Sequence, residues 1–581
     1  MSDFKPPPHA FLPTSRKELE ARGWDNVDII LFSGDAYIDH PSFGIAIIGR
    51  VLEAQGYRVA MVPQPNWRDD LRDFTKLGRP RLFFGVGSGS MDSMVNHYTA
   101  GKRLRSNDSY TPEGKAGMRP DRAVEVYSRI LKQLYPDVPV VIGGIEASLR
   151  RLSHYDYWED AWKPSILIES GADYLVYGMG ERAIKELAQK LRSKATVAEL
   201  RQTPQIAYME HSLSSLPQER LSLRAYEQCL HDKQACIDNF NTMEREANRP
   251  KASVMVEPVG QVHIVVNPPY PSMTSDELDA VYDLPFTRLP HPRYKTKHIP
   301  AYEMIKHSIC LHRGCFGGCS FCTIAAHQGK QVVSRSEASV LREVRAQLAH
   351  PDFKGVLSDL GGPTANMYGM QGKNKTLCAD CVRSSCLFPG LCPNMNHDHS
   401  RLTALYRMVR QEPGIRHAFV GSGIRYDLFL DEHGFLSPDG QEYFEEVLRH
   451  HLSGRLKVAP EHTQAHVLHC MEKPSFRLFE RLKTCFDQIN LREQLKLKLI
   501  PYFISGHPAC TQNDMADLAQ KLQSDKMTVE QVQDFCPTPM TRSSVLFYAE
   551  KDPKTGKKIF VEKNNVLKNK QKSYFFKKND D

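Results

Sequence analysis

The strongest constraint on the fold is an alternation of short apolar runs with helical segments, which occurs twice along the chain. In the first 200 residues, residues 45–56 have the spacing of a helix, and five apolar runs predict strands. These runs are residues 27–32, 58–62, 81–86, 138–142 and 173–177. Uninterrupted apolar runs are typical of strands buried on both faces, as in parallel sheets covered by helices. We therefore predict an α/β fold with a doubly wound parallel sheet over residues 1–200.

A second alternating series extends from about residue 305 to residue 548. Its predicted strands are residues 305–310, 355–360, 417–421, 456–459, 498–504 and 545–548. Six such repeats predict a partial or full parallel (β/α) barrel over residues 301–548, with chemistry at the strand ends. Residues 201–300 lack this rhythm and are rich in proline, so we expect a linker and packing segment there.

Composition excludes several classes of protein. Hydrophobic residues make up 41% and charged residues 25% of the 581 residues, which is ordinary for a globular protein. No run is long enough to span a membrane, and the N-terminus has prolines where a signal peptide needs an apolar stretch, so we expect a cytoplasmic protein. Residues 551–581 contribute +6 of the net charge of +8. We expect residues 549–581 to be a disordered basic tail, and nothing outside it indicates nucleic-acid binding.

Fourteen cysteines in a chain without a signal peptide indicate metal or redox chemistry rather than disulfides. Cys315, Cys319 and Cys322 follow the first strand of the second series with the spacing C-x3-C-x2-C. Three thiolates on one glycine-rich loop suit an iron–sulfur cluster, and a four-iron cluster held by three ligands keeps one iron open for a substrate or cofactor. The alternative is structural zinc, which normally takes four Cys or His ligands.

A second group of cysteines lies in an insertion at residues 373–400. It consists of Cys378, Cys381, Cys386 and Cys392. Four thiolates would hold a segment of low apolar content folded around a metal. A second iron–sulfur cluster and a structural zinc both fit these spacings, and reduced free thiols are the alternative.

The triplet, with Phe321 before its last cysteine, resembles the signature of radical S-adenosylmethionine (radical SAM) enzymes. The resemblance implies a [4Fe–4S] cluster on Cys315, Cys319 and Cys322 whose open iron binds SAM. It also implies that one-electron reduction cleaves SAM to methionine and a 5′-deoxyadenosyl radical. An electron donor such as flavodoxin or ferredoxin is the partner that this activity implies.

Further segments resemble the same superfamily in chain order, and they extend over residues 359–362, 421–426, 457–462 and 533–539. Pro363 stands where the superfamily has an acidic residue. The resemblance implies that residues from the first three of these segments bind SAM. They are Gly361, Gly362, Ser422, Arg425 and Glu461. It assigns no catalytic residue.

Over residues 10–550 the chain is most similar to the YgiQ-type radical SAM proteins, through residues 37–44, 142–148 and 267–271. The N-terminal series also resembles cobalamin-binding-like domains, which implies cobalamin as a further cofactor. Here Asp39 and His40 are adjacent, whereas the cobalamin signature is Asp-x-His-x-x-Gly. The alternative is that this pair pins a βα loop.

The leading hypothesis is therefore a radical SAM enzyme whose deoxyadenosyl radical abstracts hydrogen from an unknown substrate. A methyl or methylthio transferase acting on RNA or protein is a second hypothesis. A third is a non-catalytic iron–sulfur sensor or scaffold that binds a partner through the basic tail. The sequence does not indicate an oligomeric state.

Overall fold

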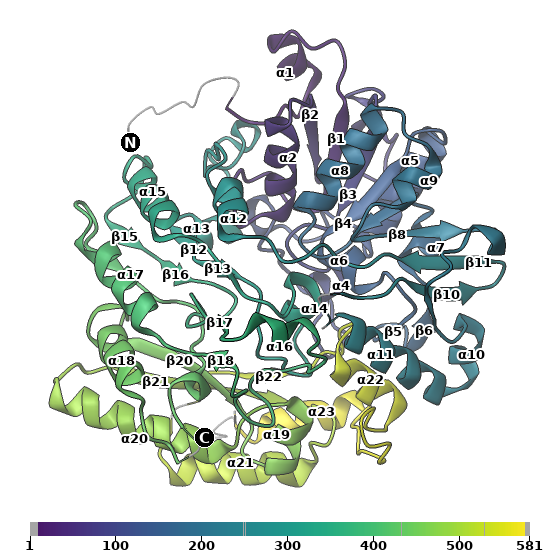
Figure 1. Ribbon diagram of the computed structural model, residues 1–581. Helices are drawn as coiled ribbons and strands as arrows, with labels where there is room; N and C mark the ends of the chain where they lie inside the picture. Colours follow the sequence, from purple (N-terminus) through teal and green to yellow (C-terminus); the bar gives the residue numbers. More distant parts are fainter. Residues whose placement is uncertain (1–9, 248, 250, 432, 528, 576–581) are drawn as a thin grey trace. The chain divides into compact units, whose positions relative to one another are not determined.

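Two sets of strands organise the chain, one in each of the two units into which the computed structural model divides (Figure 1). It describes residues 10–247, 249, 251–431, 433–527 and 529–575. Unit 1 comprises Met1–Glu246, Pro250–Pro271 and Ala280–Lys306; unit 2 comprises Ala247–Arg249, Ser272–Asp279 and His307–Asp581.

Unit 1 is built on a nine-stranded sheet of order β2-β1-β3-β4-β7-β8-β11-β10-β9, whose first five strands are parallel. These five are the strands predicted from the apolar runs. They are β1 (Ile29–Ser33), β2 (Val59–Pro63), β3 (Phe83–Gly87), β4 (Val140–Gly143) and β7 (Tyr174–Val176). Every residue of β1, β2 and β3 is buried, as expected for strands covered on both faces.

Helices cover both faces of the parallel part of this sheet. Leu31 of β1 belongs to one core cluster with residues of α2 (Gly44–Ala54) and α8 (Glu181–Arg192). The next residue, Phe32, stacks on Phe74, which in turn contacts Tyr127 of α5 (Ala123–Leu134). Because successive strand residues point to opposite faces, α2 and α8 cover one face and α5 the other.

Residues 201–300, expected to be a linker, instead contain four strands that extend the unit 1 sheet. These are β8 (Ile206–Glu210), β9 (Leu221–Ser222), β10 (Met255–Val259) and β11 (Val262–Val266). β8 runs antiparallel to β7, and β11 runs antiparallel to β8 and β10. Antiparallel strands toward the edge of a sheet tolerate polar residues and proline, such as His263 and Pro258, so they lack the apolar runs of the central strands.

Unit 2 contains three sets of parallel strands. β12 (Ser308–Cys310) pairs with β16 (Asp359–Gly361), and β15 (Val356–Leu357) pairs with β19 (His417–Ala418). The third set, β20 (Arg455–Glu461), β21 (Lys498–Ser505) and β22 (Val532–Asp534), is also parallel.

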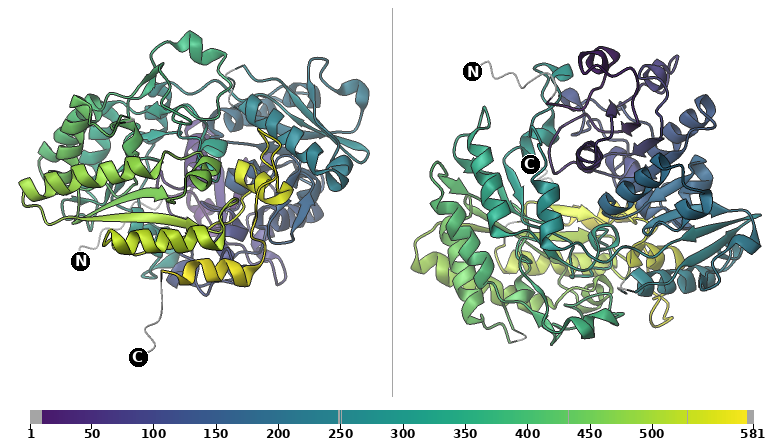
Figure 2. Two further views of the ribbon diagram at one scale, coloured as in Figure 1. Left: turned by 90° about the horizontal axis from the view of Figure 1, so that it is seen from below. Right: turned by 45° about the horizontal axis from the view of Figure 1, so that its top comes forward.

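Helices follow these strands along the chain and share one hydrophobic core with them. They are α15 (Glu337–Leu348), α17 (Ser400–Gln411), α18 (Pro438–His450), α20 (Phe476–Arg492) and α21 (Gln512–Ser524). Figure 2 shows α20 and α21 beside β20 and β21. Unit 2 is therefore an α/β unit with parallel pairing, as the second alternating series predicts.

The predicted last strand, residues 545–548, is wrong: these residues lie in helix α22 (Arg542–Ala549). A four-residue apolar run does not distinguish a strand from a buried helical turn, and most residues of this helix are buried. The last parallel strand is β22, which begins the segment 533–539 singled out by resemblance.

The expectation of a disordered tail is wrong up to residue 575. Helix α23 (Asn565–Ser573) packs against α21, β21 and β22. The side chain of Gln571 is fully buried; its Oε1 accepts a hydrogen bond from the Gly506 N–H at 2.7 Å, and its Nε2 donates to the Cys510 carbonyl at 3.2 Å. Most lysines of this segment are exposed, and only Lys568 and Gln571 of α23 are buried, so composition alone did not indicate the packing. Residues 576–581 lie outside the described residues.

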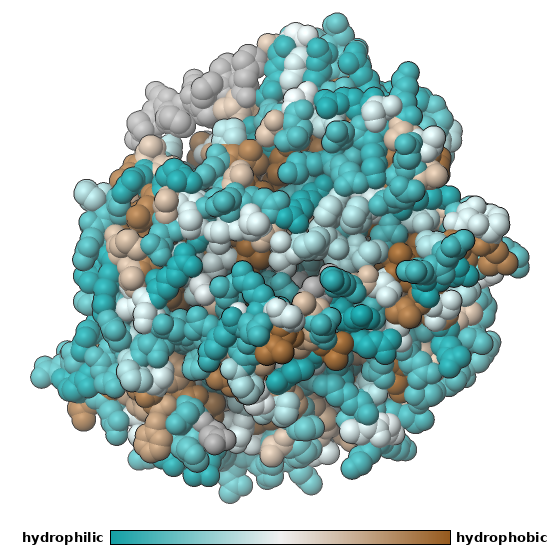
Figure 3. Space-filling model, in the orientation of Figure 1, coloured by the Kyte–Doolittle hydropathy of each residue, from teal (hydrophilic) through white to brown (hydrophobic). Residues whose placement is uncertain are grey.

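The visible face of the molecule is mostly hydrophilic, with apolar side chains in small scattered groups (Figure 3). Over the part of the chain that the structure describes, no helix combines the length and the apolar character needed to cross a membrane.

Candidate functional site

The cysteine triplet lies on a loop between β13 (His312–Arg313) and α14 (Ile324–Gln328), just beyond β12. The loop needs glycine at two positions. Gly314 has φ +83°, and a Cβ there would lie 2.2 Å from the Gln331 carbonyl oxygen. Gly318 has φ +63°, and its Cβ would lie 2.6 Å from the Ser384 carbonyl oxygen. Only glycine combines this backbone with such close approach, so the glycines fix the path of the loop around the thiols.

Two of the three half-buried thiols, Cys315 and Cys322, resist ionisation. Burial, together with the neighbouring Cys319 and Cys315, raises the pKa of Cys322 to about 12. Burial also raises the pKa of Cys315. Because thiolates are the metal-binding form, a metal must displace these protons when it binds.

The donor set bears on the kind of metal centre that the loop can hold. A structural zinc ion normally takes four Cys or His ligands, whereas three thiolates can hold a four-iron cluster and leave one iron open. Three half-buried thiols on one loop therefore fit an iron–sulfur cluster better than one zinc ion.

A buried arginine compensates the negative charge that the thiolates would carry. The Nη1 atom of Arg425 lies 3.1 Å from the Cys319 Sγ. Asp427 holds the guanidinium through a 2.9 Å Nε–Oδ1 hydrogen bond, and Asn366 Oδ1 accepts the Arg425 backbone N–H at 2.8 Å. A Cβ on Gly317 would lie 2.9 Å from Nη1, so the missing side chain gives the guanidinium its place beside the loop.

A second charged pair lies beside the same loop. Glu461, at the end of β20, has φ +70°, and its Oε1 is 3.6 Å from Nζ of Lys473. Burial raises the pKa of Glu461, while Lys473 and Arg425 oppose this rise. The Glu461 charge in turn raises the pKa of Cys322, which places the carboxylate in the electrostatic neighbourhood of the triplet. Arg425 and Glu461, both predicted from sequence, therefore lie near the cysteine loop.

The loop is anchored at Ser320, between the second and third cysteines. Its Oγ donates to the Cys470 carbonyl at 2.7 Å and lies 2.7 Å from Oγ of Ser543. The backbones are joined as well, because the Ser543 N–H donates to the Ser320 carbonyl at 2.9 Å. Nε2 of His507 lies 2.7 Å from the Ser543 Oγ, and burial lowers the pKa of His507 to about 3. A neutral imidazole and two hydroxyls thus hold the loop without adding charge.

Two strand ends bring the remaining predicted residues together around Asp359. The Ser422 hydroxyl donates to Asp359 Oδ2 at 2.5 Å, and a Cβ on Gly361 would lie 3.0 Å from the Ser422 Oγ. A Cβ on Gly362 would lie 2.6 Å from Nε2 of His312, which is fully buried beneath it. The two glycines therefore allow β16 to end in close contact with the segment after β19.

Several supporting residues were missed by the sequence analysis. Asp427 follows Arg425 by two positions, and this spacing was a readable signal for an ion pair. Asp359 lies in the segment 359–362 that resembles the superfamily, but only Gly361 and Gly362 of that segment were predicted to bind SAM. Ser543 is 223 residues from Ser320, and nothing local to either serine indicates the contact.

The insertion with the second cysteine group packs directly on the cysteine loop. The Ser385 hydroxyl donates to the Gly317 carbonyl at 2.7 Å, and the Cys386 N–H donates to the Phe316 carbonyl at 3.0 Å. Gly318 allows this contact, because any side chain there would overlap Ser384 and Ser385.

The second group brings its cysteines near one another without closing them around one small ion. Burial raises the pKa of Cys386, Cys392 and Cys381 raise it further, and Lys330 opposes them. Cys378, on α16 (Lys375–Ala379), accepts a hydrogen bond from the Asn394 side chain at 3.2 Å. No three of the four sulfur atoms, all within the described residues, fit within 4.8 Å of one another.

In unit 1, the order β2-β1-β3 places the topological switch point between β1 and β3, where open α/β sheets bind ligands. The chain itself fills this edge. Arg119 pairs with Asp35, just after β1, at 2.8 Å and with Asp108 at 3.0 Å, and it donates to the Ser88 carbonyl, just after β3, at 2.9 Å. All four residues are buried, so β1 and β3 end against the protein's own ion pairs.

The Asp39–His40 pair also has structural partners. The Asp39 carboxylate pairs with Arg50, with a 3.0 Å Nε–Oδ1 distance, and accepts the Thr287 N–H at 2.8 Å. His40 is buried, and its Nδ1 accepts the Ser42 N–H at 3.0 Å. These contacts match the alternative in which the pair pins a βα loop. Together with the filled switch point, they do not fit a cobalamin cofactor.

We therefore predict that the protein does not retain cobalamin. Anaerobic protein incubated with hydroxocobalamin and then desalted should contain less than about 0.1 cobalt per chain by atomic spectroscopy, because Arg119 and its partners occupy the switch point. Retention of about one cobalt per chain would contradict this reading of unit 1.

A second prediction concerns Gly318. Replacing Gly318 with alanine should displace the insertion and strain the loop, because the added Cβ meets backbone at 2.6 Å and φ is +63°. Iron content after anaerobic reconstitution should fall at least about twofold, and the protein should lose about 2 kcal/mol or more of stability. Gly390→Ala is the matched control in the same insertion, since nothing lies within 4 Å of its Cβ position. Equal iron content in the two variants would refute the role given to Gly318.

Residues 11–308 match the family described as Radical SAM N-terminal. A UPF0313 protein of Bacteroides thetaiotaomicron is 55% identical over 580 residues, covering 97% of this chain and 94% of its own length. A UPF0313 protein of Porphyromonas gingivalis is 54% identical over 570 residues, covering 97% of this chain and 90% of its own. Among solved structures, the radical S-adenosylmethionine methyltransferase TsrM of Kitasatospora setae aligns with a TM-score of 0.49 and 15% identity, covering 87% of this chain and 72% of that one. The chain belongs to the UPF0313 family of YgiQ-type proteins and carries the Radical SAM N-terminal domain.

Proposed function

We propose that this protein is a radical SAM enzyme whose cysteine loop holds a [4Fe–4S] cluster. When bound, the cluster supplies one electron for the cleavage of SAM, yielding a 5′-deoxyadenosyl radical that abstracts hydrogen from a substrate. The observation that carries the proposal is the triplet itself: three half-buried thiols on one glycine-rich loop, with the buried Arg425 3.1 Å from the Cys319 sulfur.

Arg425 makes the thiolate form of the loop tolerable. Burial of an ion is costly unless an opposite charge and hydrogen bonds compensate it. Arg425 provides both at Cys319, and Asp427 fixes the direction of its guanidinium. Nζ of Lys473 lies 3.6 Å from Oε1 of Glu461 and compensates its charge. Glu461 and Asp427, the two acids next to the loop, therefore each have a cationic partner.

The strand ends around Asp359 offer a surface for SAM. Asp359 orients the Ser422 hydroxyl, and the neighbouring Gly423 is exposed with no atom within 4 Å of its Cβ position. Exposed glycine backbone next to a fixed hydroxyl can approach a polar ligand closely. We assign SAM binding to Gly361, Gly362, Ser422, Arg425 and Glu461 as the residues that would contact it, within a partial (β/α) barrel.

The proposal also requires a one-electron donor, for which a reduced flavodoxin or ferredoxin is expected. Unit 1 has no step assigned to it, because its switch point is closed by Arg119 and its partners. The substrate class is left open.

The decisive measurement is formation of 5′-deoxyadenosine from SAM by the anaerobically reconstituted, dithionite-reduced protein. We expect product that depends on the cluster, and Cys315→Ala should reduce it to the level of iron-free protein because the cluster loses one of its three ligands. Cys485→Ala is the matched control, since it removes a half-buried thiol from α20 and should retain the iron and the product.

Two results would contradict the proposal. One is full SAM cleavage by Cys315→Ala. The other is a protein with an intact cluster that forms no 5′-deoxyadenosine alone or with extracts that supply candidate substrates; this second result would favour the sensor or scaffold hypothesis.

We also propose that Cys378, Cys381, Cys386 and Cys392 bind a second metal centre. The support is the proximity of Cys381, Cys386 and Cys392 and the contact of Cys386 with the cysteine loop. We propose an iron–sulfur cluster as this centre, with structural zinc as the alternative.

Iron counts test this second centre. Reconstituted protein should contain about eight iron atoms per chain, and the double variant Cys386→Ser/Cys392→Ser about four, with 5′-deoxyadenosine formation still dependent on Cys315. Four iron atoms in the unaltered protein, together with a zinc ion that is lost in Cys386→Ser/Cys392→Ser, would show that the second centre is zinc. Four iron atoms in both proteins, with no zinc that depends on Cys386 and Cys392, would remove the second centre.

A further inference from the structure

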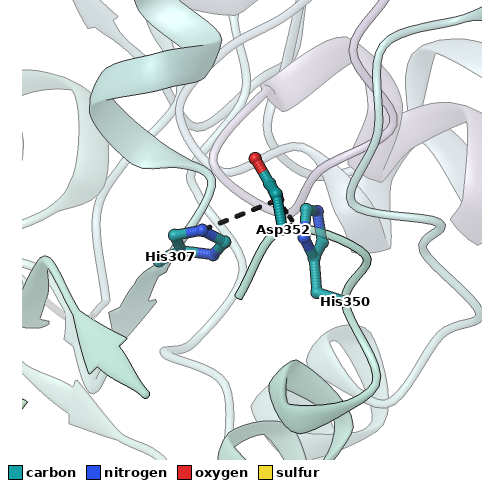
Figure 4. A group of neighbouring side chains, drawn as sticks. All are labelled: His307, His350 and Asp352. Carbon is teal, nitrogen blue, oxygen red and sulfur yellow. Dashed lines mark ion pairs between the residues drawn. The ribbon is translucent and has the colours of Figure 1, made fainter. Parts of the chain in front are cut away.

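Two histidines and an aspartate converge at the amino end of the first strand of unit 2 (Figure 4). His307 directly precedes β12. His350 and Asp352 lie in the connection between α15 and β15. The cysteine loop lies beyond the other end of β12, so this group belongs to the opposite end of that strand and has no part in the function proposed above.

The three side chains already have the spacing of a metal site. Oδ1 of Asp352 lies 2.6 Å from Nδ1 of His350 and 3.7 Å from Nε2 of His307. All three ligand atoms fit within 4.8 Å of one another, and within the described residues no other group of three or more His, Cys, Asp or Glu side chains does so. Tetrahedral zinc with ligands at about 2.0–2.1 Å needs separations of about 3.4 Å, which the observed distances bracket.

Packing holds the two histidine rings in place, and the Asp352 side of the group is partly exposed to solvent. The His350 and His307 side chains are 4% and 13% exposed, and their rings pack edge to face with centroids 5.0 Å apart. Phe353 packs against the His307 ring at 5.1 Å. The Asp352 side chain is 46% exposed, so an ion can enter from solvent past the carboxylate. Little reorganisation is needed, because packing already orients both imidazoles.

The donor set identifies the class of ion. Two neutral imidazoles and one carboxylate suit a divalent transition metal, and zinc is the expected one. Calcium and magnesium prefer oxygen ligands throughout. Three protein ligands leave a fourth position for water.

We propose that His307, His350 and Asp352 form a zinc site that fastens the start of β12 to the α15–β15 connection. Its effect is on stability: an ion bound only by the folded state raises the free energy of unfolding. Without the ion, the Asp352–His350 and Asp352–His307 ion pairs and the edge-to-face contact of the two rings join these residues.

The test uses full-length, iron-loaded protein under anaerobic conditions, so that the thiols are occupied by iron. The protein is dialysed against micromolar Zn²⁺, and zinc and iron are counted by atomic spectroscopy. We expect about one zinc per chain with unchanged iron, and less than about 0.2 in His307→Gln/His350→Gln, since loss of ligands removes the site. Zinc should also raise the melting temperature of the unaltered protein and not that of the double variant.

His417→Gln is the matched control, because His417 is an exposed histidine at the start of β19. It should bind zinc like the unaltered protein. Asp352→Asn is a second variant for the case in which the double variant does not fold, since Asp352 is partly exposed; it should bind zinc at least about tenfold more weakly. Equal zinc content and equal thermal response in the unaltered protein and these variants would overturn the proposal, as would zinc uptake matched by loss of iron.

Discussion

Three half-buried thiols lie on one short loop, and the role proposed for them requires that they carry negative charge, which the residues around the loop compensate. Burial holds the pKa values of Cys315 and Cys322 high, so the bare loop favours neutral thiols. Arg425, in the segment after β19, is a compensating cation for them; Asp427 in the same segment and Asn366 in the segment after β16 hold it in place. The loop has glycine at positions 317 and 318 because side chains there would overlap the Arg425 guanidinium and the insertion, respectively.

In unit 1, buried charges pair with one another and fill the edge of the sheet where a ligand would bind. Its parallel sheet has the strand order at which open α/β sheets bind cofactors, but Arg119 and two aspartates occupy the switch point. Removing one partner of such a network leaves an uncompensated buried ion, which costs several kcal/mol. The edge is therefore a fixed part of the scaffold, and the chemistry proposed here belongs to unit 2.

Much of this arrangement could be predicted from sequence because its signals are local. Buried parallel strands such as β1 and β3 are uninterrupted apolar runs, and the cysteine triplet lies within eight residues. The strands β8, β10 and β11 were missed because antiparallel strands nearer an edge carry polar residues and proline, and β9 because it has only two residues. Helix α22 was taken for a strand because four apolar residues fit either structure. The contacts that hold the site, such as Ser320 with Ser543, join distant segments and leave no local pattern.

The anchoring of the cysteine loop by Ser543 also sets an order of events during synthesis. Ser543 is made 223 residues after Ser320, which at about 5–20 residues per second is a delay of about 11–45 s. During this interval the triplet has emerged from the ribosome while its hydroxyl anchor has not yet been translated. The loop is anchored in its final shape only once α22 has been made, so this part of unit 2 is completed late in synthesis.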